Sequence, residues 1–302
     1  MNVSVIIPTL NSELYLDKLI ERLNKQTEKF KLFVIDSSST DKTLEVLDRY
    51  NVAYHQIPRN KFDHGGTRTM AAKMAEGDIL VFMTQDALPA DIYAIENIVK
   101  MFKNEKVAAV YGRQLAYEDT NMFGKHLREF NYINKSYVRD KKDIAKYGIK
   151  TAFLSDSFAA YRKSSLESIG WFKDGLILGE DTYAGAKLIL GDYSLAYVSD
   201  AKVYHSHSYT IWQEFKRYFD IGVFHAMEEW IIKEFGKAEG EGLRYIRSEY
   251  KYLLSHGAWY LLSELFIRNG MKYLGYKMGQ KFELLPMWLI KKFSMHHRWW
   301  DK

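Results

Sequence analysis

Residues 3–41 read VSVIIPTLNSELYLDKLIERLNKQTEKFKLFVIDSSSTD, so that two short apolar runs flank an amphipathic segment. The runs at 3–7 and 31–36 are rich in β-branched and aromatic residues, as β-strands are. Between them, residues 12–26 carry apolar side chains at three- and four-residue spacing, as one face of a helix does. A strand, a helix and a strand in this order predict a βαβ unit with two parallel strands.

The same alternation continues to about residue 111. It predicts an α/β fold with a Rossmann-like, mostly parallel sheet and helices on its faces. Ligands of such sheets bind beyond the carboxyl ends of the strands, so polar residues that directly follow a strand are candidate site residues. Further strands are expected at 52–57, 79–84 and 107–111, and helices at 41–50, 66–75 and 90–102.

The rest of the chain has a different pattern. Residues 114–149 are charged and irregular, and a connection of this length is usually functional or mobile. After residue 209 the strand pattern disappears, and residues 212–235, 243–268 and 287–293 are expected to form helices rich in Trp, Tyr and Lys. We therefore expect two domains, an α/β domain at 1–208 and a helical region at 209–302.

Composition excludes several classes of protein. The chain of 302 residues contains no cysteine, which excludes a disulfide scaffold, a Cys-ligated zinc site and a catalytic thiol. Its net charge of +5 is too weak for a dedicated nucleic-acid binder. The N-terminus lacks the features of a secretory signal, and no apolar run reaches the roughly 18 residues of a membrane span. We expect a cytoplasmic protein whose contact with a membrane is peripheral.

Two polar clusters follow the first two strands. They are Pro8-Thr9-Leu10-Asn11 and residues 36–41, which read DSSSTD. Each cluster alone also fits turn and helix-cap chemistry. Because both follow parallel strands, we expect them to lie along one rim of the sheet, and this favours a binding role.

Two further clusters follow in the first third of the chain. Residues 62–69 read FDHGGTRT and lead into a helix, where adjacent glycines would admit an anion and Arg68 would add a fixed charge. The alternative is a glycine turn with a surface arginine. Asp86 follows the apolar strand 79–83, where a carboxylate can hold a divalent cation or cap the next helix.

The last two candidates lie between residues 179 and 207. Glu180 and Asp181 pair two acids at the expected start of a helix, where acids also serve as partners of the helix dipole. His205 and His207 are expected on the same side of a strand, although an isolated histidine is more often structural than a metal ligand.

Taken in order, these clusters resemble the inverting family-2 glycosyltransferases of the GT-A fold, over about residues 1–209. VIIPTLN at 5–11 resembles the first-strand signature of that family, and VID at 34–36 with STD at 39–41 resembles its nucleotide-base loop. TQD at 84–86 occupies the metal motif, with one acid. The segments at 62–68 and 82–87 more narrowly resemble bacterial rhamnosyltransferases that use dTDP-L-rhamnose to build cell-surface polysaccharides.

The resemblance implies a role for each candidate residue. Asp181 would be the general base, with Glu180 positioning donor or acceptor, and Asp86 with His205 would hold Mg²⁺ or Mn²⁺ on the diphosphate. Arg68 would assist the metal, and Asp36 would hydrogen-bond the pyrimidine base. The residues expected to bind the nucleotide sugar are Pro8, Thr9, Asn11, Asp36, Ser38, His64, Gly66, Arg68 and Gln85.

The implied reaction transfers L-rhamnose from dTDP-β-L-rhamnose to a hydroxyl of a lipid-linked saccharide, forming an α-L-rhamnoside. A UDP-hexose or UDP-N-acetylhexosamine donor is the alternative within the fold. A catalytically inactive membrane adaptor is the alternative outside enzymes, although the spaced set of Asp86, Asp181 and His205 argues against it.

The helical region carries most of the net charge. Residues 209–302 have 15 basic and 11 acidic residues, a net charge of +4. MWLIKKF at 287–293, followed by Arg298-Trp299-Trp300, mixes aromatic residues with cations, as a helix on an anionic lipid surface does. The alternative is that these aromatics pack against the catalytic domain or a second copy of the chain, in a homo-oligomer. The lipid interpretation would place the enzyme on the inner face of the cell membrane.

Overall fold

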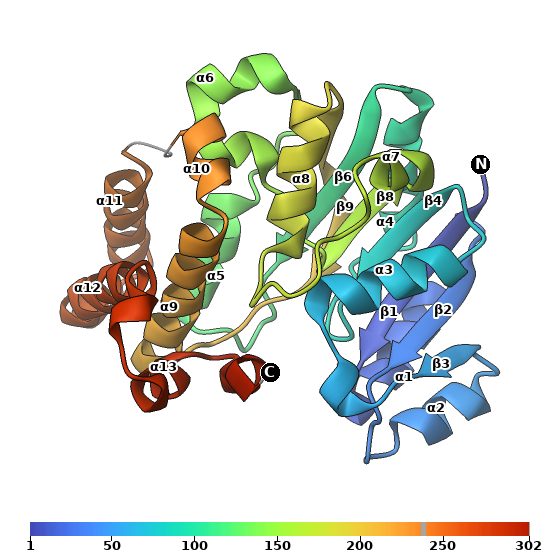
Figure 1. Cartoon of the computed structure of the whole chain (residues 1–302), viewed down its shortest axis with the longest axis horizontal. Helices are drawn as coiled ribbons and strands as arrows, with labels where there is room; N and C mark the ends of the chain where they lie inside the picture. The colour runs from blue at the N-terminus through green and yellow to red at the C-terminus, as the bar shows by residue number, and fades with distance from the viewer. Residues whose placement is uncertain (237–239, 302) are drawn as a thin grey trace.

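The opening pattern forms β1 (Val3–Thr9), α1 (Glu13–Leu23) and β2 (Lys31–Asp36). In the computed structural model, which describes residues 1–236 and 240–301, β1 pairs in parallel with β2. Figure 1 shows these elements, in blue, at one end of a long twisted sheet. The predicted βαβ unit is confirmed.

Nine strands of the described residues form a single mixed sheet in the order β3-β2-β1-β4-β8-β6-β9-β5, with β7 paired to β9. The α/β fold is confirmed, but the sheet is less parallel than expected, because β8 runs antiparallel to both β4 and β6. The chain returns to the sheet at the carboxyl end of β4, where Thr84 N donates to Ser157 O, so β8 has to run in the opposite direction. The other strands are β3 (Tyr54–Gln56), β4 (Ile79–Met83), β5 (Leu88–Pro89), β6 (Val107–Leu115), β7 (Tyr137–Arg139), β8 (Phe158–Arg162) and β9 (Ser194–Tyr204).

The sheet is buried on both faces. Val5 and Ile7 of β1 belong to one hydrophobic cluster and Ile6 to the other, as the alternation of side chains along a strand requires. Helices α1, α2 and α4 pack on the first face, and α3, α7 and α8 pack on the second. The bounds of these helices are α2 (Thr43–Arg49), α3 (His64–Met74), α4 (Ala94–Val99), α7 (Lys163–Ser168) and α8 (Glu180–Leu190).

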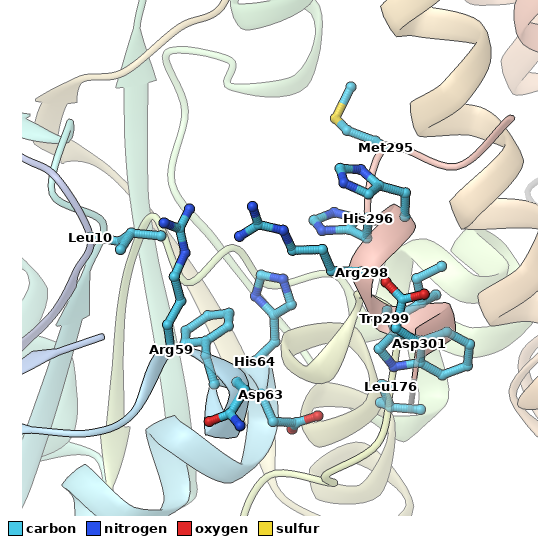
Figure 2. Close-up of a pocket in the computed structure, with 14 residues that line it drawn as sticks. Leu10, Arg59, Asp63, His64, Leu176, Met295, His296, Arg298, Trp299 and Asp301 are labelled. Atoms are coloured by element: carbon cyan, nitrogen blue, oxygen red, sulfur yellow. The ribbon is translucent and has the colours of Figure 1, made fainter. Parts of the chain in front are cut away.

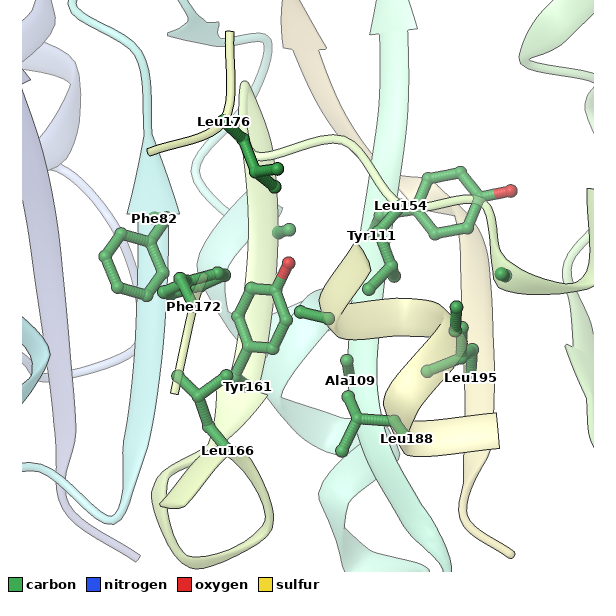
Figure 3. Packing of buried hydrophobic residues seen from close by; sticks show 14 of the residues in the cluster. Phe82, Ala109, Tyr111, Leu154, Tyr161, Leu166, Phe172, Leu176, Leu188 and Leu195 are labelled. Carbon is green, nitrogen blue, oxygen red and sulfur yellow. The ribbon is translucent and has the colours of Figure 1, made fainter. Parts of the chain in front are cut away.

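Three aromatic rings pack together within the second cluster (Figure 3). Phe172 packs edge-on against Phe82 at 5.2 Å and against Tyr161 at 5.1 Å, the geometry that aromatic quadrupoles favour. The hydroxyl of the buried Tyr161 donates to the Asp156 carboxylate at 2.6 Å. The core therefore orients a carboxylate directly.

Some boundaries differ from the sequence expectation. Helix α3 begins at His64, two residues earlier than expected, because the Asp63 side chain caps it by accepting from Gly66 N at 2.8 Å. His205 and His207 do not lie on a strand, because β9 ends at Tyr204. The segment 114–149 is not one irregular connection, since it contains the end of β6, α5 (Met122–Asn131), β7 and α6 (Ile144–Tyr147).

The C-terminal region is helical, as predicted, with more breaks. The helix expected at 212–235 divides at Glu228 into α9 (Ile211–Met227) and α10 (Glu229–Phe235). The helix expected at 243–268 divides near Gly257, whose φ of +69° ends α11. The remaining elements are α11 (Glu241–Ser255), α12 (Leu262–Gly279), α13 (Met287–Phe293) and the 3₁₀ turns η1 (Arg59–Lys61), η2 (Lys100–Lys103), η3 (Lys141–Asp143), η4 (Gly148–Ala152), η5 (Trp259–Leu261), η6 (Phe282–Leu284) and η7 (His297–Asp301).

The helical region packs directly on the sheet. Phe219 of α9, Phe235 of α10 and Ile290 of α13 belong to the same hydrophobic cluster as Phe82 and Tyr161. The division at residues 208 and 209 stays a prediction. Among the helices that the structure describes, none has the length and apolar character to cross a membrane.

Candidate active site

The loops that follow β1, β2 and β4 lie together at one edge of the sheet, as their parallel pairing predicts. Asn11 joins the first two loops, because its side-chain oxygen accepts from Thr40 N at 2.9 Å. Gln85 joins the first and third, since its amide accepts from Leu10 N and donates to Leu10 O. Pro8 and Thr9 end β1 at the same edge. The clusters after the first two strands therefore form one continuous rim.

Asp36 lies beneath the rim. Its carboxylate is fully buried and accepts from Thr9 Oγ1, Ser39 N, Ser39 Oγ and Gln56 Nε2. These contacts fix the carboxylate in place, and its contact with a nucleotide base stays a prediction. Ser38 beside it has a φ of +58° and donates to Ile57 O, so Asp36 and Ser38 shape the rim from below.

The glycine cluster forms a tight packing site instead of an anion cradle. A Cβ on Gly65 would lie 1.8 Å from Lys173 O, so the loop before α8 needs glycine there. Gly66 N already donates to the Asp63 cap, which also accepts from Gly175 N. The N–H of Gly66 thus helps to hold the protein's own loops together, and its role in binding a nucleotide sugar stays a prediction.

Arg68 pairs with carboxylates of the protein. Its side chain is buried, with Nη1 3.0 Å from Glu180 Oε1 and Nε 3.3 Å from Asp156 Oδ2. Nη1 also donates to His64 O. Its contact with the leaving group stays a prediction, and the contacts that the structure shows neutralise Glu180 and Asp156. A buried charge without partners would cost several kcal/mol, and these contacts remove that cost.

Three carboxylates meet around Arg68. Asp181 Oδ2 accepts from Asp156 N at 3.4 Å, and Asp181 Oδ1 accepts from Thr182 N at 2.6 Å. Glu180 and Asp181 begin α8 immediately after Gly179, whose φ is +84° and whose added Cβ would press on the Phe224 ring at 3.0 Å. Only glycine fits there, so this turn places both acids at the site.

The three carboxylates have different proton affinities. Burial, and then the charge of Glu180, raises the pKa of Asp181 to about 6. Burial raises the pKa of Asp156 well above its ordinary value, although Arg68 opposes this. Burial is also the largest single influence on Glu180 and disfavours its ionised form, but Arg68, His64 and a backbone hydrogen bond together lower the pKa of Glu180. One arginine cannot neutralise three carboxylates, so Asp181 is poised to take up a proton near neutral pH.

Asp86, His205 and His207 form a second cluster. The Asp86 Oδ2 atom lies 3.5 Å from His205 Nε2 and 3.8 Å from His207 Nε2, and the three ligand atoms all lie within 4.8 Å of one another. Two donors that share one ion at about 2.1 Å each lie no more than about 4.2 Å apart. Both carboxylate–imidazole distances satisfy this limit. Burial lowers the pKa of His207 to about 4, so it offers a lone pair at neutral pH.

Gln114 determines which nitrogen of His205 carries the proton. Gln114 Oε1 accepts from Arg128 Nη1 at 2.6 Å, so its amide orientation is fixed, because a guanidinium only donates. The same oxygen lies 2.9 Å from His205 Nδ1, which must therefore donate. In neutral His205 the Nε2 lone pair then faces Asp86 Oδ2, which also carries lone pairs. A cation bound between the two atoms would replace their repulsion with attraction. The residues thus fit a divalent metal ion.

The two clusters are connected through one side chain. Gln114 Nε2 donates to Ser155 Oγ at 2.9 Å, and Ser155 directly precedes Asp156 of the acid cluster. Gln114 belongs to β6, His205 follows β9, and Asp156 precedes β8. Neighbouring strands of the sheet therefore hold the acid cluster and the His–Asp cluster in register.

A pocket of about 790 Å³ opens beside the acid cluster (Figure 2). Leu10 of the rim, Arg59 after β3 and His64 of α3 line one side. The chain's last residues line the other, and the rings of His64 and His296 meet at 5.2 Å. His64 thus lines the pocket, and its role in binding a nucleotide sugar stays a prediction.

Sequence reasoning missed several of these residues. Asp156 has a readable signal, because it lies just before an apolar strand, but its relevance depends on that strand being antiparallel. His207 was noted without a role, although it lies two residues after His205. Gln114 and the C-terminal pocket residues have no local signal, since only the folded chain brings them to the site.

Comparison with known proteins identifies the family. The model of "Glycosyl transferase family 2" matches residues 4–170. The chain belongs to glycosyl transferase family 2. The resemblance predicted from the order of the polar clusters is therefore confirmed, and the chain is a glycosyltransferase.

Two relatives of this glycosyltransferase match along nearly their full length. The O-antigen chain rhamnosyltransferase RfbN of Salmonella typhimurium is 43% identical, over 100% of this chain and 96% of the relative. The O-antigen chain rhamnosyltransferase WbaN of Salmonella anatum is 42% identical, over 99% and 95%.

Solved structures share the fold at lower identity. The mannosyltransferase PcManGT from Pyrobaculum calidifontis, in complex with GDP-Man and Mn²⁺, superposes with a TM-score of 0.62 at 19% identity, covering 100% of this chain and 88% of that one. Staphylococcus aureus TarS 1–349, in complex with UDP-GlcNAc, has a TM-score of 0.54 at 18% identity, covering 94% and 91%. These similarities confirm the GT-A fold.

Proposed function

We propose that this glycosyltransferase transfers L-rhamnose from dTDP-β-L-rhamnose to a hydroxyl of a lipid-linked saccharide in cell-surface polysaccharide synthesis. The observation that carries this proposal is the full-length similarity to two O-antigen chain rhamnosyltransferases. The acid cluster beside a pocket supports the chemistry, because transfer to a hydroxyl needs a base next to a sugar site.

Asp181 acts as the general base in this proposal. The acceptor oxygen forms a bond to the anomeric carbon while the bond from that carbon to the diphosphate oxygen breaks, and the nucleoside diphosphate leaves with the electron pair. The hydroxyl proton passes to the Asp181 carboxylate. A single displacement inverts the anomeric centre, so a β-linked donor yields an α-L-rhamnoside.

Glu180, Arg68 and Asp156 set the properties of this base. Arg68 keeps Glu180 ionised, and the Glu180 charge helps to keep the pKa of Asp181 near neutrality. The Asp156 N–H donates to Asp181 Oδ2 and directs the carboxylate. Arg68 is therefore a positioning residue here, whereas the sequence suggested a contact with the diphosphate.

Asp86, His205 and His207 would hold the metal ion. A bound divalent cation supplies positive charge that stabilises the leaving diphosphate. Two imidazoles and one carboxylate suit Mn²⁺ better than Mg²⁺, which prefers an all-oxygen octahedron. We therefore propose Mn²⁺ as the preferred ion, with Gln114 orienting His205 toward it.

The rim loops would receive the nucleotide. Leu10 and Arg59 of the pocket lie beyond the carboxyl ends of β1 and β3, where nucleotides bind in α/β folds. Thr9, Asn11 and Gln85 connect these loops through hydrogen bonds and would keep the binding surface rigid. Asp36 would act indirectly, through its buried contacts with Thr9 and Ser39.

The membrane contact is proposed at a place that differs from the sequence expectation. In the segment that the sequence suggested, Trp299 and Trp300 pack against the main core, whereas Met287 and Trp288 are 51% and 66% exposed. On α12, Phe266, Ile267, Tyr273 and Leu274 are exposed at helical spacing, and Trp259 and Tyr260 precede them with 70% and 65% exposure. With Lys277 at the end of the stripe, this face suits an anionic lipid surface that carries the acceptor.

A panel of nucleotide sugars tests the donor. The chain is incubated with Mn²⁺, a lipid-linked acceptor and, in turn, dTDP-β-L-rhamnose, UDP-glucose, UDP-N-acetylglucosamine and GDP-mannose, and nucleotide release is measured. Transfer only from dTDP-β-L-rhamnose is the expected result. Faster transfer from a UDP sugar would favour the hexosyl or N-acetylhexosaminyl alternative, and no transfer from any donor would favour a membrane adaptor.

A further inference from the structure

The C-terminal residues 294–301 pack over the pocket beside the acid cluster. Met295, His296, Arg298 and Trp299 line the same cavity as Leu10 and Arg59, which lie more than 200 residues earlier in the chain. The match to the family model ends at residue 170, so the family model does not include this segment.

A buried carboxylate anchors the segment. Asp220 of α9 is fully buried, and its Oδ2 accepts from Met295 N at 2.8 Å and from His296 N at 3.2 Å. Ser294, also fully buried, accepts from His296 N at 3.0 Å. Trp299 and Trp300 pack against the main core. The segment is therefore held at both ends, and Arg298 lies between the two anchors.

Two arginines that lie more than 200 residues apart in the sequence extend into this pocket. Figure 2 shows the side chains of Arg59 and Arg298 reaching into the same space from opposite walls. Neither guanidinium is part of a salt bridge within residues 1–236 and 240–301, although the carboxylates of Asp63 and Asp301 line the same pocket and Lys291, and to a smaller degree Arg298, lowers the pKa of Asp301. The two carboxylates offset the two arginines in net charge, so the preference for an anion depends on the space between the two guanidinium groups, where an anion meets both. Guanidinium groups bind phosphate oxygens through paired N–H donors.

We propose that Arg298 and Arg59 form a clamp for a diphosphate group, so that the C-terminal segment is part of the substrate site. The diphosphate is that of the nucleotide or that of a lipid-linked acceptor, since both carry the same chemistry. The inference rests on the proposed function only in taking a nucleoside diphosphate as the donor. His64 and His296 add imidazole edges to the same pocket.

Isothermal titration of the full chain with Mn²⁺ tests the clamp. The probes are dTDP, UDP, thymidine and geranyl diphosphate, and the variants are Arg298→Ala, Arg298→Lys and Arg59→Ala. Loss of a charged, bidentate contact is expected to raise Kd about ten- to a hundredfold for a diphosphate probe, with thymidine unchanged. Arg298→Lys should recover part of the affinity, because it restores the charge without the planar fork.

The probes identify the source of the diphosphate. A weaker dTDP or UDP affinity with unchanged geranyl diphosphate assigns the clamp to the donor, and the reverse assigns it to the acceptor. Lys292→Ala is the matched control, because Lys292 is exposed on α13 and does not line the pocket. The clamp is overturned if both arginine-to-alanine variants keep every Kd within twofold of wild type.

Failure of the proposed function is a separate result. If the wild-type chain binds neither dTDP nor UDP, the donor assignment fails, while geranyl diphosphate still measures the clamp. Tm measurements establish that each variant is folded, and Arg59→Ala keeps the test valid if Arg298→Ala unfolds the segment, because Arg59 belongs to a different element.

Discussion

The proton affinity of Asp181 determines the expected pH dependence of transfer. The residue must be ionised to act as a base, and its pKa is raised to about 6. We therefore expect kcat/KM to rise through about pH 6 and to level off above it. Asp181→Asn should lower kcat by about 10²–10⁴-fold, the usual contribution of a general base. A pH profile of the wild type and single-turnover assays of the variant measure both effects.

Binding assays separate the role of Asp181 as a base from a role in folding. Asp181→Asn should keep the Kd for dTDP within about twofold of wild type, because the residue acts on the acceptor side. Asp200→Asn is the matched control, since Asp200 is an exposed acid on β9 and should leave transfer unchanged. Undiminished turnover of Asp181→Asn would remove it as the base.

The His–Asp cluster predicts the effect of single substitutions on metal affinity. Asp86→Ala or His207→Ala removes one of three ligands, and we expect Mn²⁺ affinity to fall at least tenfold, as measured by electron paramagnetic resonance. Gln114→Leu should lower Mn²⁺ affinity about 10–100-fold, because it removes the oxygen that keeps the proton on His205 Nδ1. His256→Ala, at an exposed histidine on the end of α11, is the control. Equal Mn²⁺ binding by all these variants would contradict the site.

The packing of α9 on α12 depends on glycine, and this makes a prediction about stability. A Cβ on Gly279 would lie 2.0 Å from Phe219 O, and one on Gly275 would lie 2.4 Å from Phe215 O. Gly279→Ala should therefore lower the free energy of unfolding by about 1–3 kcal/mol, the usual cost of overpacking. Gly270→Ala in the same helix meets no atom within 4 Å and should be neutral or stabilising, by up to about 1 kcal/mol. Urea denaturation compares the two, and equal stability would contradict the tight packing.

The exposed face of α12 predicts lipid binding by this element. Replacing Trp259, Phe266 and Tyr273 together with serine should strongly reduce flotation with anionic liposomes, because it removes the exposed apolar surface. Leu14→Ser is the control, since Leu14 is 85% exposed on α1 at a distant part of the chain. If the triple variant floats like wild type, the membrane proposal fails for this face. A wild-type dimer that the variant converts to monomer would identify a second copy of the chain as the partner instead.

In the whole molecule, residues from the N-terminal part and from the C-terminal segment line the pocket beside the acid cluster. The first strands supply the rim, and residues 294–301 supply the opposite wall of the pocket. The helices that carry this wall share one hydrophobic cluster with the sheet, so changes in the helical region reach the site through packed side chains. Of the net charge of +5, +4 lies in residues 209–302, so most of the basic character belongs to the helical region.

Local patterns were sufficient for much of the fold. Strands β1, β2 and β4 and helix α13 form within one or two residues of their predicted bounds, because apolar periodicity reports directly on burial. The mixed direction of the sheet was not predictable in this way. Strand direction depends on where the chain re-enters the sheet, and the pattern within β8 contains no information about its neighbours.

The partners of charged residues were not predictable from the sequence, for a physical reason. A sequence shows that Asp36 and Arg68 follow strands or begin helices, but not which of their partners come from distant segments. The Asp36 carboxylate accepts hydrogen bonds from Ser39 and Gln56. Arg68 forms ion pairs with Glu180 and Asp156. The energy of a buried charge depends on such partners, so only the tertiary structure distinguishes a buried support from a residue that meets substrate.

The sequence by itself determined the order of strands and helices from β1 to β4, the rim of polar residues after β1, β2 and β4, and the family, because short-range periodicity and motif order are properties of the chain. Only the tertiary structure decided that His207 joins Asp86 and His205, that Asp156 supports Asp181, and that the C-terminal segment closes the pocket. These contacts join residues far apart in the sequence, and they form only when the core that packs the helices on the sheet brings them together.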